Sequence, residues 1–330
     1  MPLAARIVLH WFLIGGLIGL WLGAPVRAAD YPAWLAADLN PDPPTPEFAL
    51  FPIRGPRLIV PLPESLRNRT ISVFGAEGKA VCALTARGII KVEFNPLRQE
   101  IIPGSSEVSS IWSLTVVRES GHVFVSGLAA RGGCGTFEID PRAGTVRTIL
   151  AGPLPHCGGG GGAVSPDGKH IAKYKDGKLE LADVKGGAVR VIGGFGESMT
   201  GGGPGPGHLY WADINWMYRA GWSPDGRWIS LATWGDRIVL IDSGSLERRR
   251  NLGPSVGQVS MAWSPDAKYL LAAQPDSLFF NGSLVAVDVE TGRRFKIKGT
   301  HHNLTGRGPI GWMDPSIARS ATLVGGSRSK

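Results

Sequence analysis

A repeated turn signal constrains the fold of this chain more than any other feature of its sequence. The tetrapeptide Ser-Pro-Asp-Gly occurs twice in full, and related strings recur before and after these copies. The residues at the glycine position of the six copies are Gly78, Gly121, Gly168, Gly226, Ala267 and Ser316. Their successive spacings of 43, 47, 58, 41 and 49 residues indicate one supersecondary unit repeated along the chain.

Each unit places its turn in the same order of elements. An apolar segment stands on either side of the turn, and a loop, a segment of alternating polarity, a second glycine turn and a last segment follow. The clearest second halves are KLELADVKGGAVRVI, RIVLIDSGSLERRRNL and SLVAVDVETGRRFKI. Alternation with a period of two predicts strands. With 47 Gly and 25 Pro in 330 residues, the sequence predicts an all-β fold.

The chemistry of the turn explains why its residue types recur. Pro fixes φ for the second turn position, Asp accepts hydrogen bonds from nearby backbone amides, and Gly takes the positive φ that closes the turn. Ser165 and Ser223 are therefore expected to be structural. A serine nucleophile needs a histidine within reach, and no histidine recurs with the repeat.

The sequence SPDG(K/R), followed by an apolar strand and (L/V)xxxDxxxG, resembles the repeat of WD-repeat-like bacterial propellers, particularly the six-bladed periplasmic TolB type. The resemblance covers residues 71–330. It implies a single six-bladed β-propeller, with seven blades as the alternative, and it says almost nothing about biochemical function. In such propellers an N-terminal strand commonly completes the last blade, and residues 48–60 are the apolar segment available for this.

The N-terminal residues divide into two expected segments before the propeller. Residues 1–29 combine a basic start, an uncharged apolar run at 7–24 and small residues around Val26 and Ala28, which predicts a signal peptide. Because the run is long, a membrane anchor is the alternative. We expect a proline-rich linker over residues 30–56 and the propeller over 57–330. The chain is then extracytoplasmic: periplasmic or secreted, or tethered to the inner membrane through residues 7–24.

Repeated aromatic residues and the cysteines fit this architecture. Trp222, Trp263 and Trp312 stand just before successive turns, and Phe74 takes the matching place in the first unit. We interpret them as packing between inner strands; a stacking platform for a ligand is the alternative. The predicted loops of Cys134 and Cys157 open on one face of neighbouring blades, so we expect these two to form a disulfide. Cys82 is expected to be a buried free thiol.

Function is expected where the period breaks. An aromatic and glycine-rich insertion causes the spacing of 58, and we place it on the same face as the cysteine loops. The binding-face candidates are His156, His208, Tyr210, Trp211, Asp213, Trp216, His301 and His302. We predict a non-catalytic propeller without catalytic residue, metal or cofactor, which binds a protein or envelope component through this loop face. The alternative is a propeller hydrolase or cyclase with a metal at the channel mouth.

The net charge of +8 narrows the range of partners. Residues 248–250 and 293–294 are runs of Arg on the expected outer strands, and we interpret them as a solvated rim. Nucleic acid is not expected as a partner outside the cytoplasm. An anionic membrane surface or an envelope polymer is compatible with the positive charge. We expect a monomer.

Overall fold

Most of the propeller is described by the structure, a computed structural model. The described residues are 34–39, 47–52, 57–67, 69, 71–152, 162–175, 178–187, 189–193, 220–233, 237–247, 249–254, 261–275, 281–297, 302–303, 310–320 and 322–323. The chain divides into two compact units, Met1–Pro32 and Ala33–Lys330, and all described residues belong to the second. The predicted signal or anchor segment lies outside them. In the described part of the chain, no helix has the length and apolar character needed to cross a membrane.

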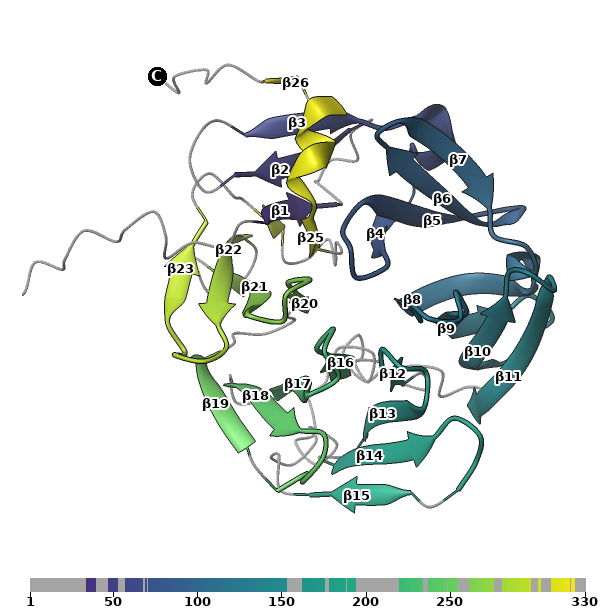
Figure 1. Cartoon of the computed structure of the whole chain (residues 1–330), viewed down its shortest axis with the longest axis vertical. Coiled ribbons are helices and arrows are strands. Elements are labelled where there is room, and N and C mark those ends of the chain that lie inside the picture. Colours follow the sequence, from purple (N-terminus) through teal and green to yellow (C-terminus); the bar gives the residue numbers. More distant parts are fainter. Residues whose placement is uncertain are drawn as a thin grey trace, which may run out of the picture. The chain divides into compact units, whose positions relative to one another are not determined.

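Six antiparallel sheets form a ring in the second unit (Figure 1). Five of them run from the centre outwards in chain order. Blade 1 has β4 (Ile71–Phe74), β5 (Ala80–Thr85), β6 (Gly88–Phe94) and β7 (Leu97–Ile101). Blade 2 has β8 (Val108–Val116), β9 (Val123–Ala129), β10 (Cys134–Asp140) and β11 (Thr145–Gly152). Blade 3 has β12 (Ala163–Val164), β13 (His170–Lys175), β14 (Lys178–Asp183) and β15 (Arg190–Ile192).

Blades 4 and 5 repeat the pattern. Blade 4 has β16 (Ala220–Trp222), β17 (Trp228–Thr233), β18 (Arg237–Asp242) and β19 (Arg249–Pro254). Blade 5 has β20 (Met261–Trp263), β21 (Tyr269–Pro275), β22 (Asn281–Asp288) and β23 (Arg294–Lys296), with β24 (His302–Asn303) pairing to β22. The short helices of the described residues are 3-10 helices: η2 (Glu64–Leu66), η3 (Ser105–Glu107) and η5 (Pro315–Ser320). The predicted all-β, six-bladed propeller is confirmed.

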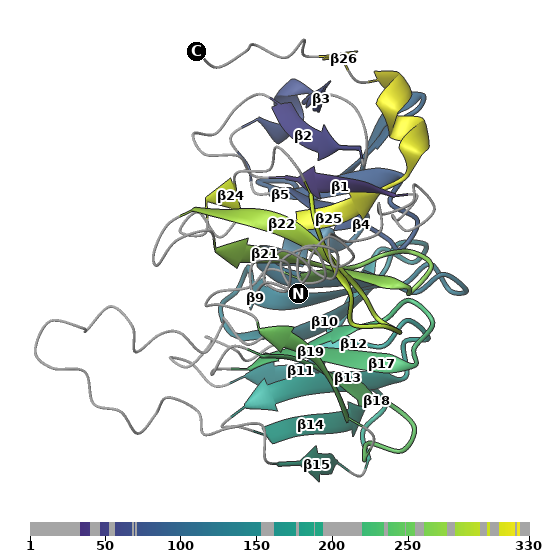
Figure 2. The same cartoon turned by 90° about the vertical axis from the view of Figure 1, so that its left-hand side faces the viewer.

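Blade 6 joins the two ends of the propeller in one sheet. Its order is β25 (Ile310–Met313), β1 (Leu35–Asp38), β2 (Glu47–Phe51), β3 (Leu58–Pro61) and β26 (Thr322–Leu323). Figure 2 shows β25, β1, β2 and β3 following one another towards the rim. The expected strand within residues 48–60 is present in this blade as β2 and β3.

The structure differs from the expectation of a linker over residues 30–56. Both β1 and β2 fall in that range, and β1 pairs with β25 as well as with β2. The linker was predicted from the many prolines of this range, but the prolines lie outside the two strands, and β1 and β2 themselves contain none. The propeller strands therefore start at Leu35 instead of after residue 56.

The degenerate sixth turn also differs from the other five. Ser316 lies in η5 and not in a strand-to-strand turn, and its N–H donates to Oδ1 of Asp314 at 2.8 Å. From η5 the chain continues to β26, which pairs with β3 on the outer side of the sheet. The N-terminal strands occupy the positions that this repeat would otherwise have filled.

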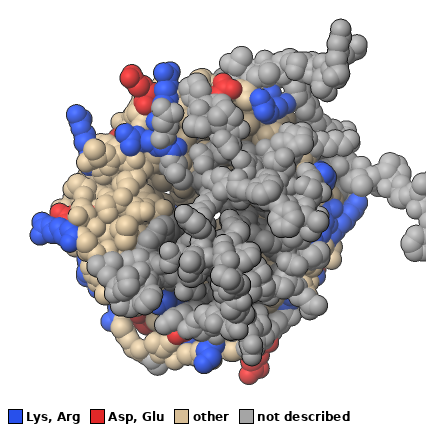
Figure 3. All heavy atoms as spheres, turned by 180° about the vertical axis from the view of Figure 1, so that it is seen from behind, with Lys and Arg blue, Asp and Glu red and all other residues tan. Residues whose placement is uncertain are grey.

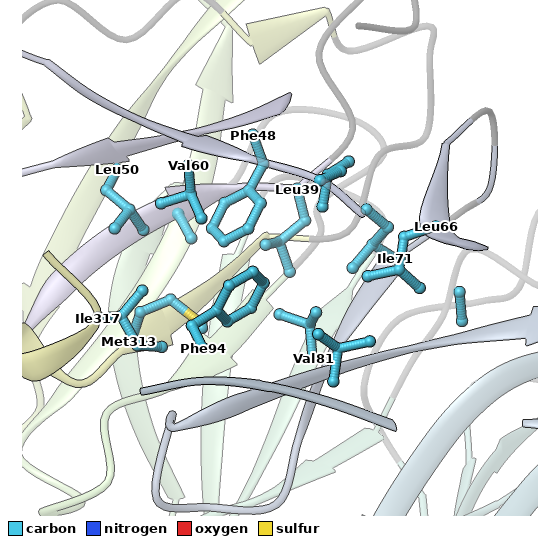
Figure 4. Close-up of a cluster of buried hydrophobic side chains, with 14 of the residues drawn as sticks. Leu39, Phe48, Leu50, Val60, Leu66, Ile71, Val81, Phe94, Met313 and Ile317 are labelled. Carbon is cyan, nitrogen blue, oxygen red and sulfur yellow. The ribbon is translucent and has the colours of Figure 1, made fainter. Parts of the chain in front are cut away.

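Hydrophobic cores lie between neighbouring blades. The core between blades 6 and 1 contains Phe48 from β2 and Phe94 from β6, whose rings meet edge to face at 5.6 Å between centroids (Figure 4). Val81 and Met313 belong to the same cluster. Similar clusters join blades 1 and 2, 2 and 3, 3 and 4, and 4 and 5. Each blade is therefore stabilised by burying both of its faces.

Candidate binding site at the central channel

The innermost strands of all six blades surround a central channel. A cavity of about 310 Å³ is lined by residues of β4, β8, β12, β16, β20 and β25. Its lining consists of small, apolar and aromatic residues such as Ser72, Thr115, Ala163, Gly221 and Met261. No titratable side chain is among the described residues that line this cavity. Such a wall offers van der Waals contact, backbone groups and a few hydroxyls to a ligand.

Tryptophans link three of the inner strands to the preceding blade. The indole N–H of Trp222 donates to the carbonyl oxygen of Ala163 at 2.8 Å, and that of Trp312 to Ala262 at 2.9 Å. The indole of Trp263 donates to Oγ of Ser230 at 3.0 Å. These contacts support the packing interpretation, because each polar end of the ring is bound inside the wall.

The Ser-Pro-Asp turns surround one mouth of the channel, and their serines are structural. Ser223 accepts the N–H of Trp228 at 2.8 Å, and Ser165 and Ser264 accept matching bonds at 2.9 Å. Each hydroxyl donates to the Asp two residues later. The serines are 2%, 0% and 0% exposed at 165, 223 and 264, so no substrate can reach their hydroxyls.

Charged side chains of both signs surround this mouth. A hollow of about 730 Å³ is lined by charged or titratable residues from blades 2, 3, 4 and 5, namely Arg118, Glu119, Asp167, His170, Arg190, Asp225 and Asp266. Burial raises the pKa of Asp167, but hydrogen bonds from the Ser165 hydroxyl and the Lys169 N–H outweigh burial, and the net pKa is lowered. Asp167 thus stays ionised at the mouth.

Comparison with known proteins identifies the fold. No family model and no curated protein matches the chain. TolB from Acinetobacter baumannii matches with a TM-score of 0.55 and 14% identity over 84% of this chain and 66% of that one. A structure assigned to TolB from Agrobacterium tumefaciens matches with a TM-score of 0.52 and 12% identity over 84% and 94%. The fold is that of a TolB-like β-propeller. At these identities the likeness concerns the fold alone.

Most of the predicted loop-face candidates of this TolB-like propeller cannot be placed. His156, His208, Tyr210, Trp211, Asp213, Trp216 and His301 lie outside the described residues. His302 lies in β24, where it pairs with Gly282 of β22, and its side chain is not described. The convergence of these residues on one face stays a prediction.

Sequence reasoning did not single out the residues of the turn-side mouth. Arg118 and Glu119 stand in the second repeat at the turn positions that Ser165 and Pro166 take in the third, and Arg190 lies in the last strand of the third repeat. The signal that could have found them is their position near the ends of strands in the turn alignment. Because connections of antiparallel strands alternate between faces, we expect the predicted loop face on the opposite side of the TolB-like propeller from this mouth.

Two of the three cysteines behave as expected. Cys134 begins β10, is buried, and is disulfide-bonded. Cys82 is free and buried, and burial raises its pKa to about 12, which keeps it a thiol. Cys157 lies outside the described residues, so the Cys134–Cys157 pairing stays a prediction.

Metal and cofactor sites were not expected. The described residues include no group of three or more His, Cys, Asp or Glu side chains that could hold a metal. The metal alternative depended on His156, His208, His301 and Asp213, which all lie outside the described ranges.

Proposed function

We propose that this protein is a non-catalytic, extracytoplasmic propeller that binds a protein or another envelope component at its central channel. The observation that carries the proposal is the combination of a small and apolar wall with a mouth that is charged. An apolar centre with a polar rim is typical of binding interfaces and ligand pockets. The predicted loop face, at the opposite end of the channel, belongs to the same proposal.

Two features support a location outside the cytoplasm. Residues 1–29 have the composition of a secretory signal or an anchor. Cys134 is disulfide-bonded, and disulfides persist mainly in oxidising compartments. Both features suit a periplasmic or secreted protein, or one that is tethered to the inner membrane.

The proposal is tested by reversing charge at the mouth. Arg118 and Arg190 line it, and both are exposed, so Arg118→Glu with Arg190→Glu changes the surface without opening a core. A binding partner recovered from envelope extracts is expected to bind the double variant at least about tenfold more weakly. The control Arg87→Glu with Arg142→Glu has the same change of charge at exposed positions that do not line the mouth. Equal loss in both variants contradicts a channel site.

The enzyme alternative has its own test. A propeller hydrolase or cyclase with a metal at the channel mouth would hold a stoichiometric divalent ion. Elemental analysis of the purified chain, followed by His208→Ala and His301→Ala, measures this directly. A bound ion that both variants lose would replace the scaffold proposal with the enzyme.

A further inference from the structure

At its outer end, the seam between blades 4 and 5 contains two arginines. Its core contains Leu240 and Leu252 from blade 4 and Val285 and Val287 from blade 5. Beyond this core the outer strands β19 and β23 lie next to each other on the rim (Figure 1). Seen from behind, the Lys and Arg side chains also lie around the outer edge (Figure 3).

Strand register directs two arginines into this seam. Arg294 lies opposite Val287, and Arg250 lies opposite Leu240. Directly opposite residues share a face of the sheet, and Val287 and Leu240 are both in the seam core. Arg250 and Arg294 therefore enter the seam from its two sides. Lys296 follows on the same face of β23, opposite Val285.

Arg294 is partly buried, and no charged side chain among the described residues forms an ion pair with it. Its Nε is a buried atom with no hydrogen-bond partner, and burial lowers the pKa of the guanidinium. A Cβ on Gly253 would lie 3.6 Å from Nη1 of Arg294, so the guanidinium lies against bare backbone of blade 4. The expectation of a fully solvated rim was wrong for Arg294, because the neighbouring blade covers part of its side chain.

In blades 1 and 2, a charge on the outer strand is compensated by the residue opposite, whereas in blade 3 the exposed Arg190 lies opposite the apolar Leu181. In blade 2, Arg147 lies opposite Glu138 and donates to its Oε2 from Nε at 3.0 Å. In blade 1, Lys91 lies opposite Glu100 at 3.0 Å. In blades 4 and 5 the opposite residues are the apolar Leu240 and Val287. Among the described residues, no ion pair involves Arg250 or Arg294.

The acidic residue of β18 on the seam face of blade 4 already accepts other hydrogen bonds. Asp242 lies opposite Trp228, which belongs to the seam core. Its Oδ1 accepts the N–H groups of Gly244 and Ser245 at 3.1 and 3.0 Å, which hold the turn after β18. Asp242 therefore serves the turn and does not neutralise Arg294.

We propose that the rim end of the seam between blades 4 and 5 is an anion site that binds a phosphoryl group through Arg250 and Arg294. A desolvated cation without a counter-ion is costly, and an anionic ligand removes that cost. Guanidinium groups pair with phosphate oxygens in a bidentate manner, and two arginines match a dianion better than a single carboxylate. The proposal does not depend on binding at the channel.

Two sources supply phosphoryl groups outside the cytoplasm: lipid headgroups, and soluble phosphate-bearing polymers. Vesicles of phosphatidylglycerol with phosphatidylcholine represent the first source, and soluble polyphosphate represents the second. Both probes are titrated against the full chain and against the double variant Arg250→Gln with Arg294→Gln. The comparison of the variant with the wild type cancels any contribution of residues 7–24 to vesicle binding.

We expect the double variant to bind polyphosphate, or the anionic vesicles, at least about tenfold more weakly than the wild type. Loss with vesicles alone assigns the site to a membrane surface, and loss with polyphosphate alone assigns it to a soluble polymer. The control Arg147→Gln removes a paired arginine of the same strand position and is expected to change neither titration. Absence of binding to both probes overturns the proposal, as does an equal loss in the control.

A stability measurement distinguishes a specific loss of phosphoryl binding from misfolding of the variant. Removing an uncompensated, half-buried charge while keeping the apolar part of the side chain is neutral or stabilising. Arg294→Met is therefore expected to unfold at the same temperature as the wild type or a higher one, while losing phosphoryl binding. A marked fall in its unfolding temperature would show that Arg294 has a structural role instead.

Discussion

At the scale of single residues, the buried serine of the three Ser-Pro-Asp turns stabilises its turn through two hydrogen bonds. The Ser223 hydroxyl accepts the N–H of Trp228 and donates to Asp225, and the residue is 0% exposed. Ser223→Ala leaves a buried N–H without a partner, so we expect a loss of about 1 to 3 kcal/mol in the free energy of unfolding, measured in urea. Ser106→Ala, at an exposed position, is the control and should change little. Equal stability of both variants would contradict the structural role.

The fifth turn contains a residue that its backbone disfavours. Ala267 has φ 60° where the corresponding Gly226 has φ 72°. An alanine in this left-handed region costs about 1 kcal/mol or more relative to glycine. We therefore expect Ala267→Gly to raise the unfolding temperature and Gly226→Ala to lower it. A Cβ on Gly226 has nothing within 4 Å, so the second change tests backbone strain without a clash. Shifts of the same sign in both variants would contradict this explanation.

At the scale of elements, the pair β10 and β11 holds a charge network that depends on pH. Burial raises the pKa of Glu138, but hydrogen bonds from His122 and Arg147 outweigh burial and the net pKa is lowered. A carboxylate with a lowered pKa stabilises the fold above its unfolded pKa of about 4.3, and this stability is lost as the pH falls through the lower folded value.

Glu138→Gln is accordingly expected to lose about 0.5 to 1 kcal/mol of stability at pH 7, with a smaller difference from the wild type in acid. Urea unfolding at a series of pH values between neutral and strongly acidic measures both effects. Glu290→Gln changes an exposed carboxylate and serves as the control. A difference that is constant across the whole series would rule out the ionic explanation.

At the scale of the whole propeller, ring closure depends on the N-terminal strands. In blade 6, β1 is the one strand that connects β25 to β2 and β3. A chain that starts at Leu39 lacks β1, leaves two sheet edges open, and is expected to lose cooperative thermal unfolding and to aggregate in size-exclusion chromatography. A chain that starts at Ala33 keeps β1 and should remain monomeric. Cooperative unfolding of the shorter chain would show that β1 is dispensable.

The features that were predicted correctly are local and repeated. The features that were missed depend on contacts between segments that are distant in the sequence. Ser-Pro-Asp-Gly specifies its turn through neighbouring residues, so the number of blades and the strand order could be predicted. The four residues Leu35–Asp38 form a strand only because β25 and β2 lie beside them, and no local pattern reports such pairing. The charged mouth and the Arg294 seam likewise combine residues from separate blades. The charge and burial of these residues depend on neighbours in space that are far apart in the sequence.

The composition of blade 6 also determines when the ring can close during synthesis. Its strands β1, β2 and β3 are among the first parts of the propeller to be translated, and β25 is among the last. The earliest strands must therefore wait, with apolar residues such as Phe48 and Leu50 uncovered, until the end of the chain arrives. In a secreted chain, these strands would stay uncovered until export is complete. The N-terminal strands of blade 6 are therefore the part of the propeller that stays open to edge-to-edge aggregation longest before the ring closes.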